Sequence, residues 1–162
     1  MARRLLKLFF VLVLILYLLL LVRLIVFKFP DDMTREILRN WSPEAVLRQA
    51  RSANLIPFHT IERSLTYRQF NSVNVLIYNI AAFVPLGLIA PALIRRRWRW
   101  LLVPLMGLLV SVGLETIQLV TTLGEADIDD VILNLAGTSI GYVLFAITVR
   151  LGNWRRRAFA LQ

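Results

Sequence analysis

Residues 111–141 read SVGLETIQLVTTLGEADIDDVILNLAGTSIG, a mostly apolar stretch in which polar residues recur at regular spacing. In the first half the polar residues follow at steps of four, three and four: Ser111, Glu115, Gln118 and Thr122. After Gly124 similar steps connect Asp127, Asp130, Asn134, Gly137 and Gly141. Residues at these spacings share one face of a helix. The stretch therefore predicts two helices that are joined by a tight turn and face each other through polar stripes.

Composition indicates that this hairpin lies in a membrane. The chain has 162 residues, of which 58% are hydrophobic, and its mean hydropathy is +0.67. These values are too apolar for a soluble domain and fit one compact membrane domain. The chain has no cysteine, which excludes disulfides, thiolate metal sites and cysteine nucleophiles.

Four apolar runs are long enough to cross a bilayer: residues 5–27, 73–94, 101–122 and 128–149. They predict an all-α integral membrane protein, a four-transmembrane-helix bundle with a longer extracytoplasmic loop after the first helix. Four regions follow: an N-terminal helix (1–27), the loop (28–72), a three-helix core (73–150) and a basic tail (151–162). We expect Pro85, Gly87 and Pro91 to interrupt the second span.

The loop at 28–72 is polar and contains one clear helix start. Ser42 precedes Pro43 and Glu44, the arrangement of an N-cap, a proline at the first position and an acid near the helix dipole. A helix at 43–52 follows, and it could lie along the membrane surface or form part of a soluble cap. His59, the single histidine of the chain, lies further along the loop, where a structural role is more common than a catalytic one.

Basic residues predict the orientation. Eleven arginines and lysines fall near the N-terminus, in residues 95–99 and near the C-terminus, whereas the 123–127 turn has none. Both termini are therefore expected to be cytoplasmic. The net charge of +9 comes largely from clusters at the ends of apolar runs. That arrangement favours contact with anionic lipid over nucleic acid.

This topology predicts an outward-facing polar pocket. Glu115, Asn134 and Asn79 lie six or seven residues into their spans from the outer side, which places each roughly 10 Å deep. The candidate ligand pocket comprises Asn79, Glu115, Gln118, Asp127, Asp129, Asp130 and Asn134. The alternative is that these side chains only cap helices or bond between them. Glu115 fits that alternative least, because neither adjacent span contains a basic partner.

Several of these residues belong to a recognisable pattern. Residues 79–87 (NIAAFVPLG), 115–118 (ETIQ) and 127–137 (DIDDVILNLAG) resemble the VanZ-like family, and 54–58 (NLIPF) is similar to its loop before the second span. The resemblance covers residues 54–149. It implies a small multi-span bacterial membrane protein, related to a named member that lowers susceptibility to teicoplanin. The family commonly has an arginine just before its acidic cluster, where this chain reads Leu123-Gly124-Glu125-Ala126.

Two functions fit these observations. The first is a non-enzymatic protein of the bacterial cytoplasmic membrane that binds a lipid or a lipid-linked cell-wall precursor in the pocket and influences teicoplanin susceptibility. The second is an intramembrane enzyme that acts on a lipid head group, with Glu115 as acid/base and a divalent cation at Asp127, Asp129 and Asp130. The first is preferred because the sequence contains no nucleophile motif, phosphate-binding glycine loop or zinc motif. The first function requires no cofactor.

Overall fold

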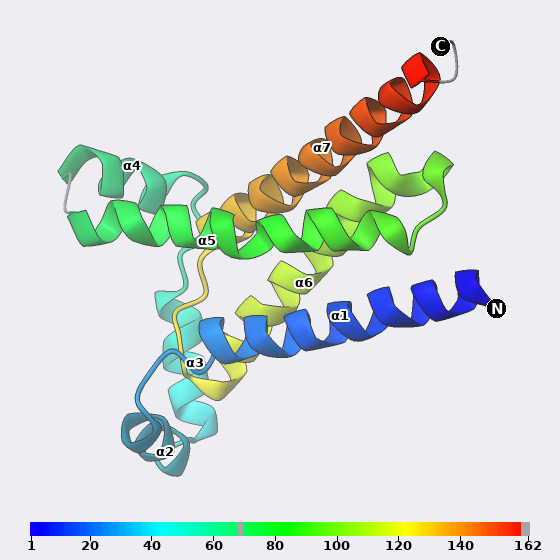
Figure 1. The fold of residues 1–162 in the computed structure, drawn as a ribbon. Coiled ribbons are helices and arrows are strands. Elements are labelled where there is room, and N and C mark those ends of the chain that lie inside the picture. Colours follow the sequence, from blue (N-terminus) through cyan, green and yellow to red (C-terminus); the bar gives the residue numbers. More distant parts are fainter. Residues whose placement is uncertain (68–69, 160–162) are drawn as a thin grey trace.

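Four long helices form the body of the protein (Figure 1). The computed structural model describes residues 1–67 and 70–159. The long helices are α1 (Ala2–Ile25), α5 (Phe70–Ile89), α6 (Arg99–Thr121) and α7 (Ile128–Phe159). Each contains a segment long and apolar enough to cross a membrane. The described part of the chain has no named strand. The predicted all-α, four-span architecture is therefore confirmed.

Helices α5 and α7 form the closest contact in the bundle. A Cβ atom added at Gly137 would lie 2.1 Å from the carbonyl oxygen of Ile80, and one at Gly141 would lie 2.1 Å from that of Val84. Glycine permits this approach because it has no side chain between the two backbones. The glycine face of the fourth span thus packs on α5.

The second span ends in an irregular segment. Helix α5 continues through Pro85 and ends at Ile89, where the 3-10 turn η1 (Ala90–Ala92) follows. Pro91 lies in that turn, and its missing N–H and fixed φ are compatible with the end of a regular helix. A second 3-10 turn, η2 (Arg96–Trp98), leads into α6.

Helix α1 makes far fewer contacts than the other spans. Only 6% of its apolar segment is buried. Near its end, Leu21 and Val26 join a core that includes Phe83 and Leu86 of α5. At its middle, the hydroxyl of Tyr17 donates a 2.7 Å hydrogen bond to the carbonyl of Ala82.

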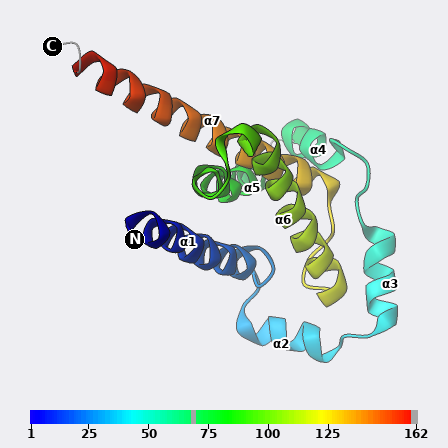
Figure 2. The same ribbon diagram turned by 90° about the vertical axis from the view of Figure 1, so that its right-hand side faces the viewer.

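Three short helices connect α1 to α5: α2 (Asp31–Arg39), α3 (Pro43–Ser52) and α4 (His59–Tyr67). They trace an arc from the end of α1 to the start of α5 (Figure 2). The helix predicted at 43–52 is confirmed as α3, and the Ser42 hydroxyl accepts the N–H of Ala45 at 3.1 Å, as expected of an N-cap. Helices α2 and α4 were not predicted.

Contacts of α3 and its flanks fix the arc to the end of α6. The indole of Trp41 donates to the carbonyl of Val120 at 2.7 Å, and the amide of Gln49 donates to the carbonyl of Gly124. These contacts place α3 against the end of α6 and the α6–α7 turn. The N-terminus, the α5–α6 connection and the end of α7 all lie at the opposite end (Figure 1).

The predicted basic tail begins as a continuation of α7. The helix extends ten residues beyond residue 149, the predicted end of the fourth span, and reaches Phe159. Residues 160–162 of the tail lie outside the described residues.

Candidate functional site

The turn between α6 and α7 organises the polar residues. Helix α6 ends at Thr121, and the next residue, Thr122, has a left-handed backbone (φ 57°). The Asp127 carboxylate accepts the N–H of Asp129 at 2.8 Å, so Asp127 is the N-cap of α7, which was the alternative to its role in a ligand pocket. The N–H of Asp127 itself donates to Glu115 at 3.1 Å. Asp127 thereby connects the start of α7 to the last part of α6.

The segment before α4 is attached to this turn by backbone and side-chain bonds. The N–H of Asn54 donates to Ala126 at 3.0 Å, and the N–H of Ile128 donates to Asn54 at 2.9 Å, which forms a short parallel bridge. The amide of Asn54 and the hydroxyl of Thr60 both donate to the Asp127 carboxylate. Asp127 is therefore occupied by structural contacts.

Asp129 holds the start of α4. Its side chain is fully buried and accepts three backbone N–H groups, from Phe58, from Thr60 at 2.7 Å and from Ile61 at 3.1 Å. Phe58 has a left-handed backbone (φ 67°) that turns its N–H into this set. The first N–H groups of a helix have no partner within the helix and carry partial positive charge, so a carboxylate stabilises them. Asp129 supplies that carboxylate from another helix.

Glu115 and Asp130 retain unused acceptor capacity. One oxygen of Glu115 accepts the N–H of Asp127, and one oxygen of Asp130 accepts the amide of Asn79. The second oxygen of each carboxylate has no hydrogen-bond partner among the described residues, and neither atom is fully enclosed. Glu115 is nevertheless only 8% exposed. These two carboxylates differ from those of Asp127 and Asp129 because they can accept further hydrogen bonds.

Asn134 and Gln118 make different contacts. The amide of Asn134 donates to Ser111 at 2.9 Å, and that of Gln118 donates to the carbonyl of Ile25 at 3.3 Å. Ser111 precedes Glu115 by four residues on α6, about one helical turn further from the α6–α7 turn. The seven candidate residues therefore do not form one level: Asn79, Glu115 and Asp130 lie near the turn, and Asn134 bonds deeper in the bundle.

A lysine missed by the sequence analysis lies near the two carboxylates. Lys28 follows the end of α1 and is within electrostatic range of both Glu115 and Asp130. Its position in the sequence suggests only a charge at the membrane boundary, because its distance from the two carboxylates depends on how α1 packs. Lys28 brings positive charge to the acidic cluster in a chain that lacks the arginine often found before it.

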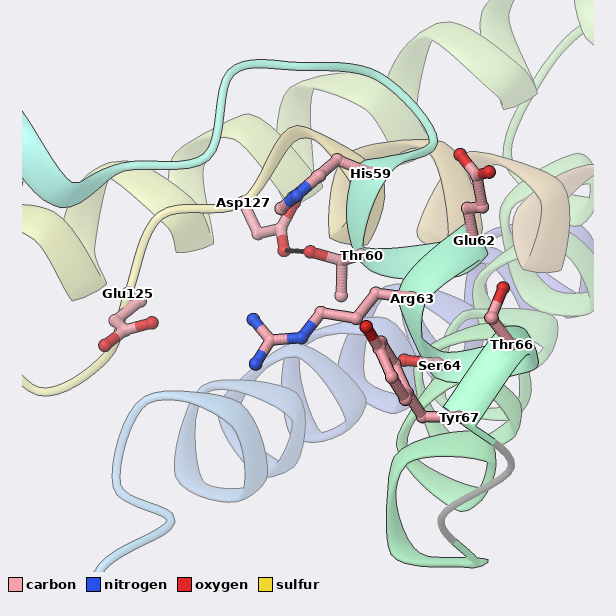
Figure 3. A pocket seen from close by; sticks show the side chains of 9 residues that line it. All are labelled: His59, Thr60, Glu62, Arg63, Ser64, Thr66, Tyr67, Glu125 and Asp127. Carbon is pink, nitrogen blue, oxygen red and sulfur yellow. Dashed lines mark hydrogen bonds between the residues drawn. The ribbon is translucent and has the colours of Figure 1, made fainter.

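A cavity of about 880 Å³ lies beside these residues, between α4 and the α6–α7 turn (Figure 3). Its lining residues carry mostly polar or charged groups: His59, Thr60, Glu62, Arg63, Ser64, Thr66, Tyr67, Glu125 and Asp127. Arg63 extends across the space toward the turn that carries Glu125 (Figure 3). Of the candidate residues only Asp127 lines it, and the helix that forms most of its wall, α4, was not predicted.

The three aspartates diverge rather than converge. Asp127 bonds to Asn54 and Thr60, Asp129 to the start of α4, and Asp130 to Asn79. Within residues 1–67 and 70–159, no group of three or more histidine or carboxylate side chains is arranged to hold a metal ion. The arrangement leaves one carboxyl oxygen each on Glu115 and Asp130 able to accept a further hydrogen bond.

Comparison with known proteins identifies the family of the chain. The family model described as VanZ/LLP1 matches residues 14–149, which include every candidate residue named above. No curated protein and no solved structure matches the chain. Because the match covers most of the sequence, the chain belongs to the VanZ/LLP1 family.

Proposed function

We propose that this protein resides in the bacterial cytoplasmic membrane and binds a lipid or a lipid-linked cell-wall component from the outer side, thereby influencing teicoplanin susceptibility. The observation that carries the proposal is the unused acceptor capacity of Glu115 and Asp130. A carboxyl deep in a membrane bundle is costly and persists where it has a partner or a function. Glu115 and Asp130 each use one oxygen to join helices, and the second oxygen of each carboxyl remains as an acceptor.

The proposed orientation places this site outward. The N-terminus, the α5–α6 connection and the end of α7 share one end of the bundle (Figure 1), and the sequence concentrates arginines and lysines in those segments. The positive-inside rule assigns that end to the cytoplasm. The α6–α7 turn, with Glu115 and Asp130 beneath it, then faces the outer leaflet.

The acceptors define the complementary ligand chemistry. The remaining oxygens of the two carboxyl groups accept hydrogen bonds, so they complement amines and hydroxyls. Phosphodiester oxygens are themselves acceptors and offer no hydrogen to them. The head group or sugar of the bound lipid therefore presents an amino or hydroxyl group to Glu115 and Asp130, with its phosphate placed elsewhere. Lipid-linked cell-wall precursors carry both kinds of donor.

Substitution of Glu115 tests the proposal. We expect Glu115→Gln to leave expression and thermal unfolding in detergent close to those of the unmodified protein, because an amide oxygen can still accept the N–H of Asp127. The change in teicoplanin susceptibility on overexpression is expected to disappear. Asp129→Asn is the matched control, for which we expect lower stability and a retained phenotype. It should lower the free energy of unfolding by about 2–3 kcal/mol, because charged acceptors are stronger than neutral ones. The change in teicoplanin susceptibility, relative to the amount of folded protein, should persist.

If Glu115→Gln keeps the full phenotype while Glu115→Leu loses both phenotype and folding, Glu115 is a structural hydrogen-bonding residue and the proposal fails. A second assay separates binding from catalysis. Purified protein incubated with lipid II or phospholipid, with and without Mg²⁺, should retain lipid unchanged. Formation of a product would instead identify an enzyme.

A further inference from the structure

A second cavity, of about 270 Å³, lies at the end of the bundle that carries the termini. Three arginines line it, Arg96 of η2, Arg99 of α6 and Arg150 of α7. Its α7 wall includes Phe145, Ala146 and Val149. No acidic side chain from the described part of the chain is among its lining residues. The cavity therefore combines concentrated positive charge with an apolar wall.

Arg99 is fixed in place by the protein. Its Nε donates to the carbonyl of Ile94 at 3.0 Å, and its guanidinium lies 5.3 Å from the centroid of the Phe145 ring. These contacts attach the α5–α6 connection to α7. Arg96 and Arg150 are exposed, and neither forms an ion pair with a carboxylate of the described residues. Two guanidinium groups thus remain available beside a third that is held rigidly.

The position of the cavity matches the boundary of a membrane. Arg150 lies near the end of the apolar segment of α7, and Trp98 and Trp100 are exposed beside the other two arginines. Tryptophan and arginine at the ends of spans are typical of the interface between the lipid head groups and the hydrocarbon. A lipid at this boundary would place its phosphate near the arginines and the start of its acyl chain against α7.

We propose that this cavity binds the phosphate group of an anionic phospholipid. Guanidinium groups bind phosphate oxygens through paired, charge-assisted hydrogen bonds, and basic pockets between spans on the cytoplasmic side suit anionic head groups. Phe145, Ala146 and Val149 favour a phosphate that carries an acyl chain over a free, fully hydrated anion. This inference is independent of the ligand at Glu115, which lies near the other end of the bundle.

Paired arginine substitutions test the site. Arg96→Gln with Arg150→Gln removes two charges that line the cavity, whereas Arg95→Gln with Arg97→Gln removes two charges from the same connection that do not. Binding of phosphatidylglycerol to the purified full-length protein is measured by native mass spectrometry, with phosphatidylcholine as the neutral reference. We expect the cavity pair to bind phosphatidylglycerol about tenfold more weakly than the control pair, as loss of charged hydrogen bonds predicts.

A third variant fills the cavity without altering charge. Ala146 is exposed on α7, so Ala146→Trp should fold normally, as judged by thermal unfolding, and should reduce phosphatidylglycerol binding. Equal loss in both double-arginine variants would assign the attraction to overall charge and overturn the site. Displacement of phosphatidylglycerol by equimolar sodium phosphate would show that the cavity takes a free anion and overturn the lipid assignment.

Discussion

Helices α1 and α7 are both apolar spans, but they differ in how much of each is buried against the other helices. Helix α1 is the most hydropathic of the four spans, yet only 6% of its apolar segment is buried, compared with 33% for α7. Lipid tails are as apolar as leucine, so hydropathy drives insertion but provides little attraction between inserted helices. Helix α7 is held by glycines that allow backbone contact and by polar bonds such as that between Asn134 and Ser111. Helix α1 is rich in leucine, and its hydrogen bonds to the other spans are the one from Tyr17 to Ala82 and, at its end, the one that the carbonyl of Ile25 accepts from Gln118.

The largest effect is expected at the glycine face of α7. Gly137→Leu should lower the free energy of unfolding by about 3 kcal/mol, the upper range of overpacking, because the new side chain meets the backbone of Ile80 at 2.1 Å. Gly141→Leu should act similarly, through Val84. Gly113→Leu on α6 is the control, since nothing lies within 4 Å of its Cβ position. Thermal unfolding in detergent measures all three, and equal melting of Gly137→Leu and Gly113→Leu would contradict the importance of this face.

A smaller effect is expected where α1 is attached. Tyr17→Phe removes the hydroxyl that donates to Ala82, and hydrogen bonds between membrane helices contribute about 0.6–1.7 kcal/mol. Tyr78→Phe provides a matched control, because Tyr78 on α5 is 66% exposed. Denaturant or thermal unfolding should distinguish the two variants. Identical stability would show that the hydrogen bond from Tyr17 does not help to hold α1.

The smallest effect is expected on the outer face of α1. Leu16 is 67% exposed, so Leu16→Ala should change stability by less than about 0.5 kcal/mol, as for other exposed positions. Leu21→Ala on the same helix is the comparison, since Leu21 is 2% exposed and joins the core. Destabilisation of equal size at both positions would indicate that a further contact covers this face of α1.

The sequence predicted features that depend on local patterns. Each span is marked by an apolar run, and α3 begins at the cap and proline of Ser42 and Pro43. Capping by Asp127 was the alternative to a ligand role, and it could be considered because Asp127 immediately precedes a helical pattern. The proximity of Glu115 and Asp127 also followed, because a short turn joins their helices.

Contacts between distant parts of the chain were not predictable in the same way. Helix α4 is short, and its start is stabilised by Asp129, a residue with no sequence signal for that role. Lys28 comes within electrostatic range of Glu115 because the end of α1 is joined to α6, where Gln118 donates to the carbonyl of Ile25. Depth counted along separate helices also placed Asn134 beside Glu115, whereas its bond goes to Ser111. Helix offsets depend on packing, which residue counting does not include.

The bridge between Asn54 and the α6–α7 turn imposes an order of assembly. Asn54 and Asp127 are 73 residues apart, so the ribosome completes α5 and α6 before this attachment can form. Until then, the first N–H groups of α4 lack the carboxylate of Asp129. A nascent chain interrupted before residue 126 would carry three inserted spans and an unattached loop, which exposes it to the proteases of membrane quality control.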